Sequence, residues 1–131
     1  MVKSFVKQVE EVIVKNWDLV SLSNYKGADY TYGDVAKKIA EIHILLDGCG
    51  VKKGDKIALC GRNSSEWGIL FMGSVTYGAV VVPILNDFTP EIVHNIVNHS
   101  QSKLICAGDS TWSGLNFSEM PNVIGALRIE D

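Results

Sequence analysis

The sequence contains little that would indicate disulfide bonds or a metal site. Its 131 residues include three cysteines, Cys49, Cys60 and Cys106, and none of them forms a Cys-x-x-Cys pair. The odd count and the apolar neighbours of Cys60 and Cys106 predict buried thiols in a reducing compartment. The three histidines have no metal-ligand spacing with these cysteines, so we expect no metal ligands in this chain.

An excess of positive charge and long apolar runs are also missing. The chain carries 12 basic and 15 acidic side chains, a net charge of −3, which offers no basic surface for nucleic acid. The N-terminus alternates charged and apolar residues, unlike a signal peptide, and runs such as GAVVVPIL are too short to span a bilayer. We therefore expect a cytoplasmic protein with no nucleic-acid partner and no transmembrane segment.

What is present is a regular alternation of helix and strand patterns. Apolar residues three and four apart predict an amphipathic helix over residues 2–16, followed by a strand and a turn in residues 18–29. A second helix is predicted to begin at Thr31, with Asp34 completing a capping box, and to end near Gly48 or Gly50. The 47% hydrophobic and 21% charged contents are typical of a globular domain.

The second half of the chain predicts a strand–helix–strand–helix–strand core. Strands are expected over residues 56–60, 79–85, 103–107 and, less clearly marked, 123–129. Asn63 or Ser64 can cap the first intervening helix, and Thr89-Pro90-Glu91 is a strong start for the next. The β-branched run at 79–85 predicts a strand buried on both faces, with Pro83 near its end or beside a gap in the ladder.

This order predicts an α/β fold with a three-layer, open, mostly parallel sheet and helices on both faces, a Rossmann-like topology. We expect a single domain over residues 1–131, with a leading helix and link at 1–29 and an α/β core at 30–131. No internal repeat or domain linker interrupts it.

No catalytic motif accompanies this scaffold. The turn after the first core strand, CGRNSS at residues 60–65, has one glycine and is neither a dinucleotide fingerprint nor a P-loop. Residues 62–64 could hold a phosphate at a helix N-terminus, although helix capping is the simpler interpretation. There is no Gly-x-Ser-x-Gly motif, and Asp109 lacks the acidic partners of a phosphorylation site, so it is interpreted as a turn residue.

Four segments, taken in order, are more specific than any single motif. Residues 30–35 read YTYGDV, residues 46–59 read LDGCGVKKGDKIAL, residues 63–67 read NSSEW and residues 78–84 read GAVVVPI. Together with the helix that follows Thr89 and the strand at 103–107, this series resembles the N-terminal part of the adenylate-forming (AMP-binding) superfamily. Within this superfamily, the leading helix and the Glu66-Trp67 pair slightly favour a resemblance to the long-chain fatty acid–CoA ligases.

The resemblance implies a function for a complete enzyme. Such ligases use ATP and Mg²⁺ to convert a carboxylate into an acyl-adenylate and pyrophosphate, and CoA then displaces AMP. The family's Ser/Thr/Gly-rich loop and its catalytic lysine come after the region covered here, so no catalytic residue is assigned in this chain. The chain is expected to be an inactive, truncated N-terminal fragment, with no cofactor of its own and with the remainder of the ligase as its partner.

The turn Asn86-Asp87-Phe88 follows the carboxyl end of a predicted parallel strand, where open α/β sheets hold their ligands. We expect this turn to face the acyl or CoA side of the cleft in a complete enzyme, with a simple helix-entry loop as the alternative. A freestanding, non-catalytic α/β module that binds a nucleotide or a protein also remains open. Truncation would expose apolar surface and would therefore favour dimers or aggregates.

Overall fold

A four-stranded parallel sheet forms the centre of the protein, and the computed structural model describes residues 4–129. In chain order the elements are α1 (Phe5–Lys15), β1 (Val20–Ser23), β2 (Asp29–Thr31), α2 (Tyr32–Gly48), β3 (Lys56–Cys60), α3 (Ser65–Tyr77), β4 (Val80–Ile84), α4 (Pro90–Ser100), β5 (Leu104–Gly108), α5 (Asp109–Trp112), the 3-10 turn η1 (Phe117–Glu119) and β6 (Gly125–Ile129). The strand order in the sheet is β4-β3-β5-β6.

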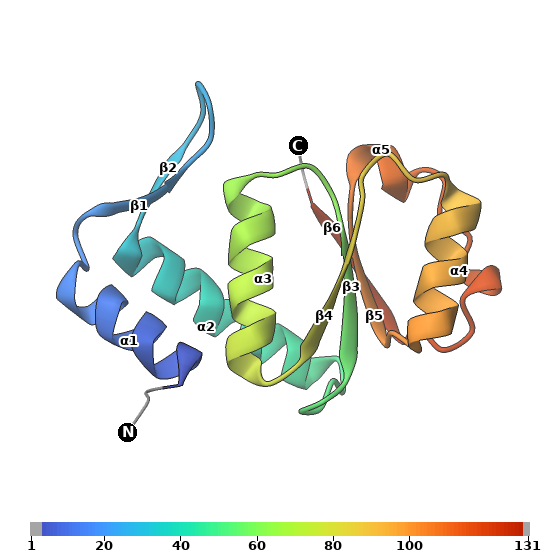
Figure 1. The fold of residues 1–131 in the computed structure, drawn as a ribbon, viewed down its shortest axis with the longest axis horizontal. Helices are drawn as coiled ribbons and strands as arrows, with labels where there is room; N and C mark the ends of the chain where they lie inside the picture. The colour runs from blue at the N-terminus through green and yellow to red at the C-terminus, as the bar shows by residue number, and fades with distance from the viewer. Residues whose placement is uncertain (1–3, 130–131) are drawn as a thin grey trace.

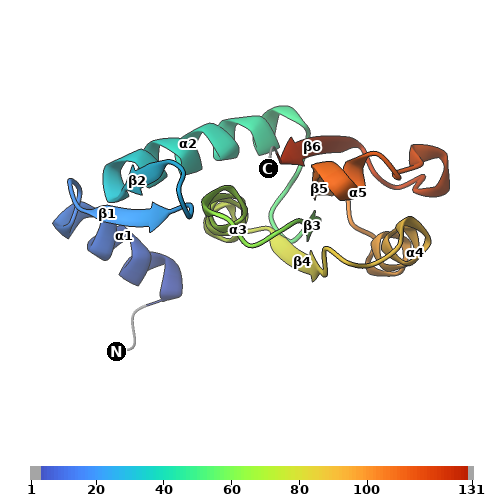
Figure 2. The same cartoon turned by 90° about the horizontal axis from the view of Figure 1, so that it is seen from above.

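Helices cover both faces of this sheet, as Figures 1 and 2 show. Helices α2 and α3 lie on one face, and α4 and α5 lie on the other. Side chains of β3 alternate between them: Ile57 and Leu59 pack toward α2 and α3, whereas Ala58 and Cys60 pack toward α4. This alternation follows from the two-residue period of a strand. The structure confirms the predicted three-layer α/β fold with a parallel sheet.

The predicted helix starts rest on observed hydrogen bonds. Thr31 and Asp34 form a reciprocal capping box at α2, and Thr89 caps α4 with Pro90 in its first turn. At α3 the cap is Ser64, whose hydroxyl accepts the Trp67 backbone N–H at 3.1 Å. Each of these side chains satisfies an N–H group that the first helical turn leaves unpaired.

The N-terminal elements form a small unit beside α2 and α3. Helix α1 confirms the amphipathic prediction, although residues 2 and 3 of the predicted range lie outside the described residues. Strands β1 and β2 pair in an antiparallel hairpin separate from the main sheet, where the sequence predicted one strand and a turn. None of the residues of α1 is buried, so this helix lies on the outside of the unit.

The expected burial of the strand at 79–85 on both faces is wrong. Strand β4 is at the edge of the sheet, and Val80 is 47% exposed. The strands with a neighbour on each side are β3 and β5, because the chain passes from β4 back across β3 to form β5. An edge position also explains Pro83, which has no N–H to donate to a second neighbour.

Candidate functional site at the carboxyl edge of the sheet

The turns that follow β3, β4 and β5 meet at one edge of the sheet. The parallel registers place Cys60 beside Ile84 and beside Ala107, and Gly108 beside Ile129. All four strands therefore end in one row. In open α/β sheets this edge is the usual position of a ligand crevice.

A crevice of about 290 Å³ lies between the turns after β3 and β4. Its polar side chains come from Arg62 and Asn63 after β3 and from Asn86 and Asp87 after β4, and the Trp67 ring of α3 contributes an apolar wall. Arg62 supplies a positive charge and Asp87 a negative one. The crevice therefore has the groups to hold a small polar molecule, without a nucleophile paired to a base.

The three site residues expected from the sequence lie in different surroundings. Asn86 lines the crevice, and its side-chain oxygen accepts a hydrogen bond from the Ser110 hydroxyl at 3.3 Å. Asp87 also lines the crevice and is exposed. Phe88 is half-buried and packs with the core cluster beneath α4. Asn86 and Asp87 are thus available to a ligand, whereas Phe88 anchors the turn to the core.

A polar cluster that the sequence did not reveal fastens the β1–β2 hairpin to the start of α3. The Glu66 carboxylate accepts hydrogen bonds from the Asn24 side-chain N–H at 3.1 Å and from the Tyr30 hydroxyl at 2.9 Å. The Asn24 side-chain oxygen in turn accepts the Ser65 backbone N–H at 2.9 Å. We call Asn24, Tyr30 and Glu66 the hairpin clamp. The hairpin residues are 42 and 36 positions away from Glu66, so no local pattern could identify their pairing.

The hairpin clamp shifts the pKa values of its own members. Partial burial alone would raise the pKa of Glu66, but the hydrogen bonds from its own backbone N–H, Asn24, Tyr30 and Ser64 outweigh it and lower that pKa. The hydrogen bond to Glu66 is the largest cause of a raised pKa at Tyr30, followed by burial and by the negative charge of Glu66. The clamp therefore holds a carboxylate anion and a neutral phenol at neutral pH.

Asp109, interpreted from the sequence as a turn residue, begins α5. Its carboxylate pairs with Arg128 of β6 through the guanidinium Nε–H. The ion pair joins the ends of two adjacent strands, β5 and β6, and the next residue in the chain, Ser110, hydrogen-bonds to Asn86. Since both side chains are more than a third exposed, its contribution to stability is small.

The thiols and histidines have structural surroundings. Cys60 is buried with its sulfur 3.4 Å from the Thr111 hydroxyl, and burial raises the pKa of its thiol. Burial raises the pKa of Cys106 further, to about 12. His43 Nε2 lies 2.8 Å from the Thr76 hydroxyl, and His94 Nε2 accepts the Asn116 backbone N–H at 3.0 Å.

Within residues 4–129, no three side chains of the histidine, cysteine or acidic types gather where they could hold a metal ion. A helix both long enough and apolar enough to cross a membrane is likewise not found in this part of the chain.

The parallel sheet between two helical layers, with a polar crevice at its carboxyl edge, defines an open α/β domain. The family described as AMP-binding enzyme matches residues 9–127. The chain therefore belongs to the AMP-binding enzyme family, whose members are adenylate-forming enzymes.

Curated relatives are considerably longer than this chain. A crotonobetaine/carnitine–CoA ligase from Proteus mirabilis is 33% identical over 85 residues, which cover 65% of this chain and 16% of that protein. The long-chain fatty acid–CoA ligase FadD13 of Mycobacterium tuberculosis is 35% identical over 82 residues, covering 57% of this chain and 16% of the relative. The chain thus spans about one sixth of the length of either relative.

Solved structures share the fold. The anthranilate CoA ligase AuaEII, in complex with anthranoyl-AMP, superposes with a TM-score of 0.88 at 20% identity, over 95% of this chain and 24% of that one. The N-terminal domain of FACL13 from M. tuberculosis has a TM-score of 0.87 at 22% identity, over 98% of this chain and 34% of that domain. The chain therefore has the fold of the N-terminal region of adenylate-forming enzymes.

Proposed function

We propose that this chain is the N-terminal portion of an ATP-dependent fatty acid–CoA ligase and that it supplies scaffold rather than catalytic groups. The observation that carries the proposal is the match of residues 9–127 to the AMP-binding enzyme family. In the complete enzyme, a carboxylate, ATP and CoA would yield an acyl-CoA, AMP and pyrophosphate. ATP, Mg²⁺ and CoA would be held mainly by the remainder of the polypeptide.

Comparison of the chain alone with a complete ligase that contains it tests this assignment. We expect the complete enzyme to release pyrophosphate when given a fatty acid, ATP and Mg²⁺, and the 131 residues alone to release none. Pyrophosphate release by the isolated chain would contradict the scaffold role. A complete enzyme that forms no acyl-adenylate from any carboxylate would contradict the ligase assignment.

The crevice beside Asn86 and Asp87 is proposed to face the acyl or CoA side of the cleft. Both side chains line it, and Arg62 across the crevice could pair with a phosphate or carboxylate of a bound substrate. The buried Phe88 would hold the turn in position rather than contact the substrate. In a complete ligase, Asn86→Ala and Asp87→Ala should then raise the KM for acyl substrate or CoA while the stability of the protein changes little.

A matched control for these substitutions is Asn122→Ala, at the opposite edge of the sheet near the start of β6. Its KM values should stay at the wild-type level. Unchanged KM values in both the Asn86→Ala and Asp87→Ala variants would contradict the proposed position of this turn.

We also propose that the complete enzyme prefers long-chain fatty acids, and two observations support this. The similarity to FadD13 and the Glu66-Trp67 pair support it, while the crotonobetaine/carnitine–CoA ligase shows that relatives of comparable identity act on other acids. A series of saturated acids of increasing length, assayed with the complete ligase, decides the point. Preference for a short or aromatic acid would refute it.

Calorimetry separates the ligase portion from the alternative of a freestanding nucleotide-binding module. Tight binding of ATP or AMP by the 131 residues alone would favour the module, and weak or absent binding favours the ligase portion.

Self-association is also proposed, because Val80 and Leu85 at the β4 edge are 47% and 66% exposed. Sedimentation velocity over a wide concentration range measures it, and a strictly monomeric chain would contradict it.

A further inference from the structure

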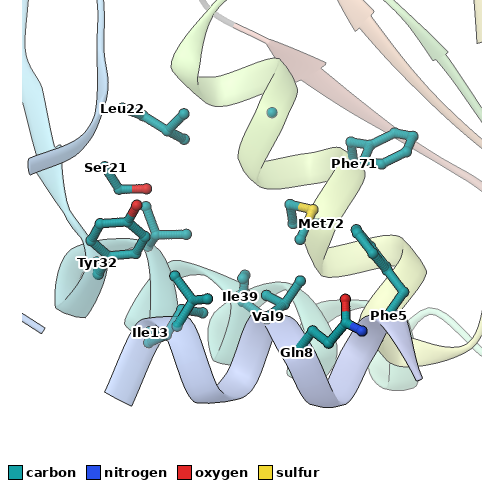
Figure 3. Close-up of a pocket in the computed structure, with 13 residues that line it drawn as sticks. Phe5, Gln8, Val9, Ile13, Ser21, Leu22, Tyr32, Ile39, Phe71 and Met72 are labelled. Carbon is teal, nitrogen blue, oxygen red and sulfur yellow. The ribbon is translucent and has the colours of Figure 1, made fainter. Parts of the chain in front are cut away.

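A second cavity lies far from the carboxyl-edge crevice, between α1, β1, α2 and α3. It has a volume of about 470 Å³ and shares no lining residue with the crevice. In Figure 3, Val9 of α1 faces Met72 of α3, Phe71 of α3 lies on the side of Phe5, and Leu22 of β1 closes one end. Its volume lies in the range of small-molecule sites, and its walls are aliphatic or aromatic apart from the Gln8 amide of α1 and two hydroxyl groups.

Two hydroxyl groups supply polarity at the hairpin end of this cavity. Figure 3 shows the Ser21 hydroxyl of β1 and the Tyr32 hydroxyl of α2 at that end. Neither hydroxyl has a hydrogen-bond partner among residues 4–129, so both can bond to a guest. No charged side chain lines the cavity to balance an ionised group.

We propose that this cavity binds a single aliphatic chain with an uncharged polar head, of the kind found in primary alcohols. The chain would lie along α3 between α1 and α2, and its hydroxyl would bond to Ser21 and Tyr32. An ionised carboxylate is disfavoured there, because it would lose water without gaining a charged partner. The site is independent of the ligase assignment, since none of its residues belongs to the crevice.

The probe is 1-octanol, titrated into the 131-residue chain and followed by NMR. We expect saturable shifts of the Met72 and Ile39 methyl signals, with affinity rising about fourfold for each methylene group from 1-hexanol to 1-octanol. Octanoate at neutral pH should bind more weakly than 1-octanol. Shifts confined to other parts of the protein, equal binding of octanoate, or no saturable binding would each overturn the proposal.

Gly68→Leu tests the position of the site. Gly68 lines the cavity, and a Cβ atom added there meets only Leu22 Cδ1 at 3.7 Å, so a larger side chain can occupy the space of the guest. We expect at least about tenfold weaker 1-octanol binding, because the new side chain displaces several methylene groups. Gly48→Leu is the matched control, since a Cβ there meets nothing within 4 Å and the residue is outside the cavity.

Thermal melts verify that the Gly68→Leu and Gly48→Leu variants are folded. Tyr32→Phe is a second test of the site, and this substitution leaves the cavity shape unchanged. Loss of one hydroxyl should weaken 1-octanol binding about fivefold and leave the chain-length dependence intact. Wild-type 1-octanol affinity in both Gly68→Leu and Tyr32→Phe would overturn the proposed site.

Discussion

Glu66→Gln is the substitution that most directly tests the hairpin clamp. The wild-type carboxylate accepts hydrogen bonds from Asn24 and Tyr30, and a glutamine keeps the shape but places one N–H group where an acceptor is needed. Hydrogen bonds to a charged group each contribute about 1.5–3 kcal/mol. Partial exposure of the clamp reduces this, so we expect the free energy of unfolding to fall by about 1–2 kcal/mol and Tm by about 5 °C.

Urea denaturation followed by circular dichroism measures the effect, with Glu119→Gln as the control. Glu119 is exposed in η1, so this variant makes the same change of charge without touching the clamp. Tyr30→Phe and the double variant with Glu66→Gln complete a mutant cycle. A coupling of at least about 0.5 kcal/mol is expected for residues in direct contact.

The effect also depends on pH. Because the folded state lowers the pKa of Glu66, its contribution is present above the unfolded pKa of about 4.3. It is lost as the pH falls through the lower, folded value, since a protonated Glu66 resembles glutamine. The difference between wild type and Glu66→Gln should therefore be full at pH 7 and should shrink below pH ~4. A difference that stays constant from neutral to acid pH, or additive single substitutions, would refute the clamp.

Two further predictions concern packing and thiol chemistry. In Gly73→Ala, the added Cβ would lie 2.8 Å from Ile42 Cγ2. Overpacking of this kind destabilises a protein by about 1–3 kcal/mol, whereas replacing a helical glycine with alanine stabilises it by about 1 kcal/mol. The melting temperature should therefore fall. Gly68→Ala in the same helix has room and should raise it, and a stabilised Gly73→Ala would contradict the tight α2–α3 contact. With a thiol reagent such as DTNB at pH 8, the half-buried Cys49 should react in the folded protein, whereas Cys106 should react only after unfolding. The reason is that Cys106 is buried and its thiol pKa is about 12. Equal reaction rates of the two thiols would contradict this burial.

Local chemistry predicted most of the secondary structure correctly. Thr31 with Asp34, and Thr89 with Pro90, each combine a capping side chain and first-turn residues within a few positions, so that the start of a helix can be read without tertiary information. The sequence does not decide between Asn63 and Ser64, because both residue types cap helices equally well. In the structure Ser64 is the cap of α3, because its hydroxyl accepts the Trp67 backbone N–H.

For the candidate site, topology predicted where two of the residues lie, and their role toward a substrate stays a prediction. The position of Asn86 and Asp87 at a strand's carboxyl end follows from topology, and both line the crevice. The role of Phe88 could not be predicted, because its neighbours in the core beneath α4 come from distant segments. The sequence indicates Arg62 only as a possible phosphate contact, and its place across the crevice from Asp87 depends on how β3 and β4 pair.

The sequence by itself determined the α/β class, the helix starts and the family, because these depend on local patterns and on their order along the chain. Only the tertiary structure decided that β4 is an edge strand, that Glu66 holds the hairpin, and that an aliphatic cavity lies under α1. Each of these depends on contacts between residues far apart in the chain. Such contacts arise from the burial of whole faces, which no short segment specifies.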